Sequence, residues 1–81
     1  MHNHNNKQVL ANLKQLVENK KLIDNFNNYI DVLIDRQHQV IEQSENNIMM
    51  YRAQGAIATL RRLKYLREEV LGNDKKTNGN V

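Results

Sequence analysis

The feature that most limits the possible folds is the absence of residues that interrupt helices. The chain of 81 residues contains no proline, and its first glycine is Gly55. Because glycine and proline are the strongest markers of turns, everything before Gly55 is expected to form helices joined by short polar connections. The chain also lacks cysteine, which excludes disulfide bonds, thiol catalysis and zinc sites built on thiolates.

Apolar residues recur at steps of three and four along three stretches of the chain, which is typical of helices with one buried face. The first stretch covers about residues 7–22, the second about 25–44 and the third about 47–71. A short polar turn separates the last two. The sequence therefore predicts an all-α protein, in which an antiparallel helical hairpin (about 25–44 and 47–71) carries an additional N-terminal helix (about 7–22).

Two polar segments are expected to limit these helices. The apolar stripes of the first two stretches are out of step at residues 24–25, so a break is predicted there, capped by Asp24 or Asn25; a stammer in one long helix is the alternative. The turn before the third helix contains Asn46 and Asn47, either of which can serve as its N-cap.

Small residues in the first half of the third helix indicate close packing inside the hairpin. Pairing the two helices about the turn places Gln37 opposite Ala56, and Gly55 costs about 1 kcal/mol in a helix interior relative to alanine. We expect close approach of another helix to offset that cost. The predicted packing residues are Gln37, Ala53, Gly55, Ala56, Leu60, Leu63 and Arg67.

The sequence predicts one helical domain over residues 7–72 between two disordered tails, 1–6 and 73–81. Gly72 is the expected C′ residue after the last helix. Because three short helices bury little surface, such a chain is expected to gain stability by assembling with itself or a partner. Apolar residues on the flanks of the predicted seams would widen such an interface: Ile34, Ile41, Ile57 and Leu66.

Nothing in the sequence favours catalysis. His2 and His4 lie in the N-terminal tail, and His38 with Glu42 is expected to be a surface contact between residues four apart rather than half of a metal site. There is no glycine-rich phosphate loop, nucleophile elbow or pair of inward carboxylates. We therefore predict a protein that is not an enzyme and has no catalytic residue, metal or cofactor.

The basic end of the third helix resembles a nucleic-acid patch at first sight. At 100° per residue, however, the charges of residues 61–67 spread around the helix axis, and Glu68 and Glu69 follow them. Arg67 alone interrupts the apolar seam. It could extend past the apolar residues to solvent, or pair with Asp24, with Asp31 or with a neighbouring subunit; a carboxylate partner is predicted.

A second face of the third helix is a candidate partner surface. Tyr51, Ala58 and Tyr65 recur every seven residues, and Arg62 lies beside them. Tyrosine and arginine are favoured at the centres of protein interfaces. Base stacking is a further possibility, although two tyrosines make a thin platform. The alternatives are that both tyrosines are simply exposed, or that the first helix packs on them.

The remaining composition narrows the partners only slightly. The net charge is +3, which does not by itself require nucleic acid. The longest uncharged apolar stretch is far too short for a membrane span, so no membrane association is expected. The N-terminal residues lack the apolar core of a secretory signal, which favours a cytoplasmic location.

The third helix also resembles a family. The stretch YRAQGAIATLRRLKYLREEV is similar to a motif of small uncharacterised helical-hairpin proteins of tailed bacteriophages, and the resemblance covers about residues 26–71 but not the first helix. The matching residues are Arg52, Gln54, Gly55, Ile57, Leu60, Leu63, Leu66, Arg67, Glu68 and Glu69. The resemblance implies a phage-encoded helical hairpin from the virion-assembly region, without a catalytic residue, located in the host cytoplasm or the virion.

These observations lead to two hypotheses. The first is a non-enzymatic helical interaction protein, a phage structural or assembly component that forms a homo-oligomer or binds a protein partner. The second is a small phage regulator that binds a host protein or nucleic acid through the basic end of the third helix. A defined oligomer would favour the first, and a monomer that binds nucleic acid with strong salt dependence would favour the second.

Overall fold

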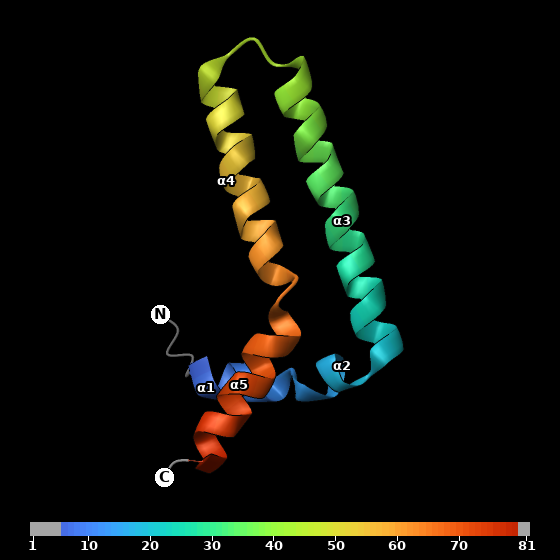
Figure 1. Ribbon diagram of the computed structural model, residues 1–81, viewed down its shortest axis with the longest axis vertical. Coiled ribbons are helices and arrows are strands. Elements are labelled where there is room, and N and C mark those ends of the chain that lie inside the picture. Colours follow the sequence, from blue (N-terminus) through green and yellow to red (C-terminus); the bar gives the residue numbers. More distant parts are fainter. Residues whose placement is uncertain (1–5, 80–81) are drawn as a thin grey trace. The chain divides into compact units, whose positions relative to one another are not determined.

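The protein is all-α, as predicted. The computed structural model describes the backbone of residues 6–79 and the side chains of residues 6–73. Every element in this described part of the chain is a helix (Figure 1). In chain order the helices are α1 (Asn6–Asn12), α2 (Lys14–Glu18), α3 (Lys20–Gln43), α4 (Asn47–Leu63) and α5 (Leu66–Gly79).

The chain divides into two compact units, which are considered separately. Unit 1 comprises residues 1–24 and 65–81, and unit 2 comprises residues 25–64. The predicted domain over residues 7–72 spans parts of both units. Helices α1 and α2 make their contacts with α5, whereas the hairpin encloses its own small core.

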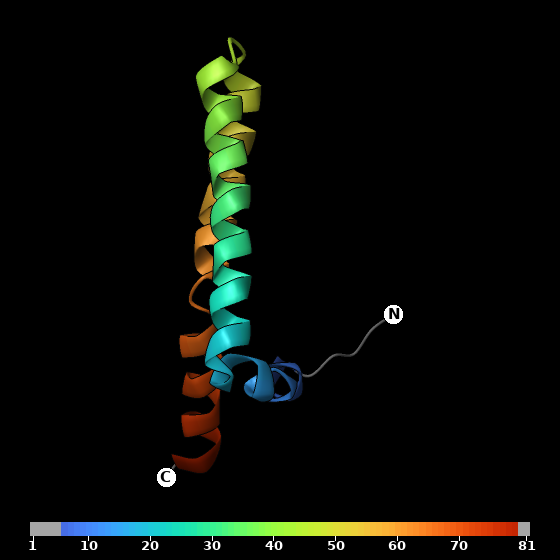
Figure 2. The ribbon, with the colours of Figure 1, turned by 90° about the vertical axis from the view of Figure 1, so that its right-hand side faces the viewer.

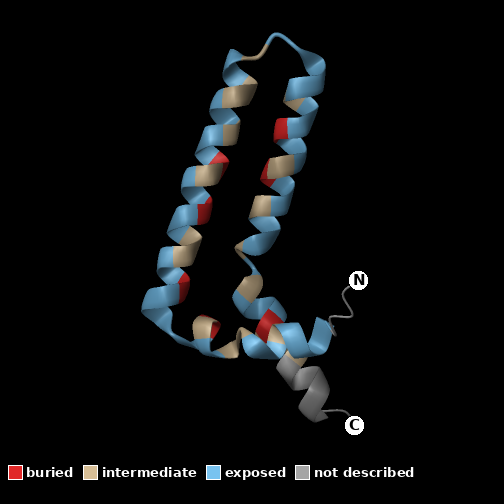
Figure 3. Cartoon of the chain, turned by 180° about the vertical axis from the view of Figure 1, so that it is seen from behind, coloured by how far each residue is buried: buried red, intermediate tan, exposed pale blue. Residues whose placement is uncertain are grey.

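Unit 2 is the predicted antiparallel hairpin of α3 and α4. Ile30 and Ile34 of α3 pack against Ile57 of α4, and the buried positions lie along the edges where the two helices face each other (Figure 3). Seen along the plane of the hairpin, the two helices lie one behind the other, so unit 2 is a single layer of helices (Figure 2). Partly buried residues complete the cluster: Phe26, Leu33, Ile41 and Leu60.

The turn of the hairpin is fixed by local hydrogen bonds. The side-chain oxygen of Asn46 accepts hydrogen bonds from the backbone N–H groups of Ile48 at 2.7 Å and Met49 at 3.3 Å. The backbone N–H of Asn46 in turn donates to the Ser44 hydroxyl at 3.0 Å. Of the two candidate caps, Asn46 is therefore the N-cap of α4, which satisfies two of the donors that a helix start leaves unpaired.

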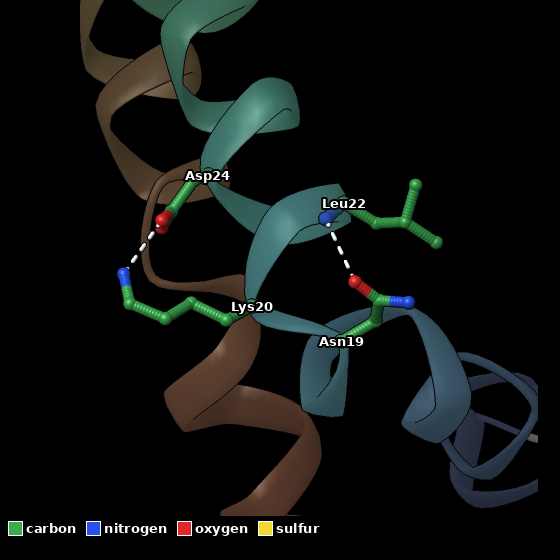
Figure 4. Close-up of polar contacts among 4 residues, drawn as sticks. All are labelled: Asn19, Lys20, Leu22 and Asp24. Atoms are coloured by element: carbon green, nitrogen blue, oxygen red, sulfur yellow. Dashed lines mark hydrogen bonds and ion pairs between the residues drawn. The ribbon is translucent and has the colours of Figure 1, made fainter.

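The break before the long helix lies at Asn19, and the predicted break at residues 24–25 is wrong. The Asn19 side-chain oxygen accepts a hydrogen bond from the backbone N–H of Leu22 at 3.0 Å and caps α3 (Figure 4). Asp24 instead lies within α3, paired with Lys20 at 2.7 Å. Ile23 is buried in unit 1, whereas Phe26 packs in unit 2. Because the two apolar stripes belong to different cores, they can be out of step along one continuous helix.

The third predicted helix is two helices, since Lys64 and Tyr65 form a turn between α4 and α5. The backbone N–H of Lys64 is shared between the carbonyls of Leu60 at 3.3 Å and Arg61 at 3.1 Å, which tightens the last turn of α4. The first helix is likewise divided, by a turn at Leu13 between α1 and α2.

Unit 1 packs α1 and α2 against α5. Its most deeply buried side chains are Val17 and Val70, each 1% exposed. Helix α5 continues through Gly72 to Gly79, so the prediction that Gly72 is the C′ residue after the last helix is wrong. Gly72 has no positive φ, and can therefore continue the helix. The remaining tail residues, 1–5 and 80–81, lie outside the described residues.

Candidate interaction surfaces

The predicted hairpin-packing residues of α4 lie at different depths in unit 2. Ala53 is 2% exposed, and Leu60 packs against the isoleucine cluster. Ala56 is half-buried and Leu63 is 39% exposed. On α3, Gln37 is half-buried. The core therefore lies one position further around each helix than the sequence predicts, because Ile34 and Ile57, expected on the flanks, are buried at its centre.

Gly55 does not pack closely against a neighbour. It is exposed, and a Cβ atom built on it would have no neighbouring heavy atom within 4 Å. Its φ is not positive. The prediction that close approach of another helix explains this glycine is therefore wrong within the chain. Ala53, which is buried, precedes Gly55 by two residues, so the two side chains point about 200° apart and Gly55 lies on the opposite side of α4.

One side of the hairpin is polar and charged. The Lys64 ammonium group lies 2.7 Å from the Asp31 carboxylate and joins the end of α4 to α3. Beside it, His38, Gln54 and Arg61 help to line a shallow hollow of about 230 Å³ between the helices. All three are exposed, and the same hollow is also lined by Ile41, Ile57 and Ala58.

The opposite side of the hairpin is apolar. At 100° per residue, the same flank of α3 carries Tyr29, Leu33 and Val40. Val40 and Met49 line a common hollow of about 410 Å³ near the turn, which shows that these flanks of the two helices adjoin. We call this surface the apolar face; its residues are Tyr29, Leu33 and Val40 of α3 and Met49, Ala56 and Leu63 of α4.

Much of the apolar face is uncovered within unit 2. Tyr29 is 58% exposed, Met49 49% and Leu63 39%. Leu33, Val40 and Ala56 are half-buried. Scattered exposed apolar side chains are ordinary, but a contiguous set on one side of a hairpin is typical of an interaction site.

The predicted tyrosine face is not continuous. Tyr51 and Tyr65 are both well exposed, at 69% and 66%. However, α4 ends at Leu63 and Tyr65 belongs to unit 1, so the seven-residue alignment extends only from Tyr51 to Ala58. Ala58 and Arg62 are exposed on α4.

Arg67 is exposed and does not have the predicted carboxylate partner. Asp24 is paired with Lys20 and Asp31 with Lys64. Arg67 and Asp24 line the same open hollow of about 560 Å³ in unit 1, yet no ion pair joins them. A partner within the chain is therefore wrong, because α5 is a separate helix on which Arg67 lies at the surface instead of continuing the seam of α4. A carboxylate partner on a neighbouring subunit stays a prediction.

The part of the chain that the structure describes has no cluster of candidate metal ligands. No three histidine or acidic side chains there gather in a way that could hold a metal ion. His38 and Glu42 are both exposed. None of the described helices is long and apolar enough to cross a membrane.

Comparison with known proteins adds no further assignment. The chain matches no protein-family model, and neither the curated proteins nor the solved structures include a significant match to it. The residues and their geometry therefore carry the functional argument.

Sequence reasoning missed the Asp31–Lys64 pair, although a signal for it existed. In an antiparallel hairpin, residues that face each other have numbers with a nearly constant sum. The sum for Asp31 and Lys64 is close to that for Gln37 and Ala56, which pairing about the turn places opposite each other. A search of the register for opposite charges would have found the pair. The isoleucine core was missed because both helices carry apolar stripes wider than one seam.

Proposed function

We propose that the protein is a non-enzymatic interaction protein that works by self-association or by binding a protein partner through its helical hairpin. The observation that carries this proposal is the apolar face, which remains exposed on a hairpin only one layer thick. Stable domains bury their apolar faces between at least two layers. A second layer from another molecule would complete such a domain.

The size of unit 2 supports the same proposal. It comprises residues 25–64, and its buried apolar side chains are few: Ile30, Ile34, Ala53 and Ile57. Domains near this length usually require disulfides, metals or oligomerisation to be stable. Cysteine is absent from the sequence, which leaves assembly as the natural source of additional stability.

The biological setting is proposed from the resemblance of residues 26–71 to small phage proteins. In that setting the protein is a structural or assembly component and acts in the host cytoplasm or in the virion. Assembly proteins need specific surfaces rather than catalytic groups, and the exposed apolar face is of this kind.

Sedimentation equilibrium of the purified full-length protein tests the proposal. We expect a defined oligomer whose population increases with protein concentration. A protein that remains monomeric across the accessible concentration range would refute self-association. Binding to a protein partner would then be the surviving form of the proposal.

A second candidate function is nucleic-acid binding. It is favoured by the charge of α4, which carries Arg52, Arg61 and Arg62 and has no acidic residue. Against it, at 100° per residue these side chains point in three different directions. Lys64, at the end of the same basic stretch, already neutralises Asp31. A gel-shift assay with a DNA or RNA probe, repeated at increasing salt, separates the two candidates.

A further inference from the structure

We infer that a hollow of unit 1, lined by Glu18 and Arg67, binds an amphipathic helix of a partner protein that carries an apolar side chain between an acidic and a basic residue. Residues of α2, of the start of α3 and of α5 form this hollow, and all of them belong to unit 1. The inference goes beyond the proposed function, which uses the apolar face of unit 2. It gives Arg67 the carboxylate that the chain itself does not supply.

The inner lining of the hollow is apolar. Val17 is 1% exposed and Ile23 5%, and Leu71 of α5, which lines the same hollow, is half-buried. The volume is about 560 Å³, within the range of about 300–1,000 Å³ that is typical of ligand sites. One large apolar side chain of a partner therefore fits into the hollow, where it would remove further apolar surface from water.

The rim of the hollow carries two charged groups that the chain leaves unpaired. Glu18 and Arg67 are exposed, and neither side chain has an ion pair or hydrogen bond with another described residue. The other two charges at the hollow, Lys20 and Asp24, extend from the same side of α3 and pair with each other at 2.7 Å (Figure 4). Of its four charged residues, the hollow therefore offers one anion and one cation to a partner.

These two opposite charges define the chemistry of the partner. A carboxylate of the partner can pair with Arg67, since a guanidinium group binds a carboxylate through two parallel hydrogen bonds. A lysine or arginine of the partner can pair with Glu18. A partner with two like charges would meet one attractive and one repulsive residue, so the arrangement selects a partner that carries one of each.

A helix fits the hollow better than an extended peptide. Every element of the described chain is a helix, which bonds most of its backbone groups internally, so the hollow offers no strand edge to an extended segment. A helical partner satisfies its own backbone and presents residues four apart on one face. The volume of about 560 Å³ corresponds to a hollow about 10 Å across, and residues four positions before and after a central leucine are about 12 Å apart on a helix. Charged residues at those positions reach the rim while the leucine enters the hollow.

Binding of three alanine-based helical peptides to the full-length protein, measured by fluorescence anisotropy, tests the inference. Each peptide has a central leucine, flanked four residues away on both sides by glutamate and lysine, by two lysines or by two glutamates. We expect the mixed peptide to bind about two- to five-fold more tightly than either like-charged peptide, as is typical of exposed ion pairs. Added salt should weaken its binding. Replacing its leucine by alanine should weaken binding about ten-fold, through loss of apolar contact.

Charge reversal separates the hollow from general attraction to a chain of net charge +3. In Arg67→Glu the peptide with two lysines should become the tightest binder, and in Glu18→Lys the peptide with two glutamates. Arg61→Glu, at an exposed position of α4 outside this hollow, changes the net charge as Arg67→Glu does. It should leave the mixed peptide the tightest binder. Circular dichroism checks that each variant remains helical.

Several results would overturn the inference. They are the absence of binding by all three peptides at millimolar concentration, equal binding of the three, and a ranking that Arg61→Glu alters as much as Arg67→Glu. Peptide-induced NMR shifts confined to residues 25–64 would place binding in unit 2 and would also refute it. None of these results bears on self-association, which sedimentation equilibrium of the unmodified protein tests separately.

Discussion

The replacement Gly55→Ala is expected to stabilise the hairpin. Gly55 is exposed in the middle of α4, a Cβ atom there meets nothing within 4 Å, and its φ is not positive. The new methyl group therefore causes no clash, and it restricts the unfolded chain. Alanine is favoured over glycine by about 0.8–1 kcal/mol in a helix interior. We expect the free energy of unfolding of the hairpin to rise by about that amount.

Urea unfolding followed by far-UV circular dichroism measures this change in the free energy of unfolding. In a thermal scan of a domain of this size, a gain of about 1 kcal/mol corresponds to a rise of about 4–8 °C in the melting temperature. The matched control is Ala58→Gly, at another exposed position of α4, which should lower the stability by a similar amount. Because the two substitutions are opposite in chemistry and similar in environment, errors in the propensity estimate affect them equally.

The result that refutes the reasoning is a loss of stability in Gly55→Ala together with the expected loss in Ala58→Gly. The control would show that helix propensity acts normally, so the added methyl group must then clash with something. Since the described chain offers no atom for such a clash, a second molecule would have to pack against Gly55.

Three further substitutions probe the core, the turn and the surface of unit 2. Ile57→Ala removes a buried side chain and should cost about 2–5 kcal/mol in urea unfolding, whereas Ile48→Ala, at a position 60% exposed, should cost about 0.5 kcal/mol or less; equal effects would place the core elsewhere. Asn46→Ala should cost about 1 kcal/mol through loss of the cap, and a larger effect of Asn47→Ala would contradict the assigned cap. Lys64→Met should cost less than about 1 kcal/mol, because its ion pair is partly exposed; a difference from wild type that persists at high salt would show that the pair is not the cause.

The sequence by itself determined the features that depend on near neighbours along the chain. The absence of proline and the late first glycine established the helical class. The polar segment before α4 predicted both the turn of the hairpin and a cap at Asn46 or Asn47. These features could be predicted because helix propensity, capping and turn formation are energies of contacts within a few residues. The antiparallel hairpin follows from them, since a short turn leaves little other choice.

Only the tertiary structure decided which side of each helix is buried. The apolar stripes of α3 and α4 are wider than one contact, so burying Ile34 and Ile57 or the predicted seam was nearly equivalent by sequence pattern alone. The choice depends on the packing of side chains between helices, which periodicity does not specify. It placed Ile57 in the core and left Met49 and Leu63 exposed.

The ends of the helices were decided in the same way. Lys64 limits a helix that periodicity would extend, because it belongs to an interaction that the local pattern does not contain. Lys64 pairs with Asp31 across the hairpin, and α5 packs with α1 and α2 in another unit. The sequence therefore determined that the chain forms helices and where the hairpin turns. The contacts between helices decided where the core lies and which apolar side chains remain exposed, because that choice is made by packing over long sequence distances.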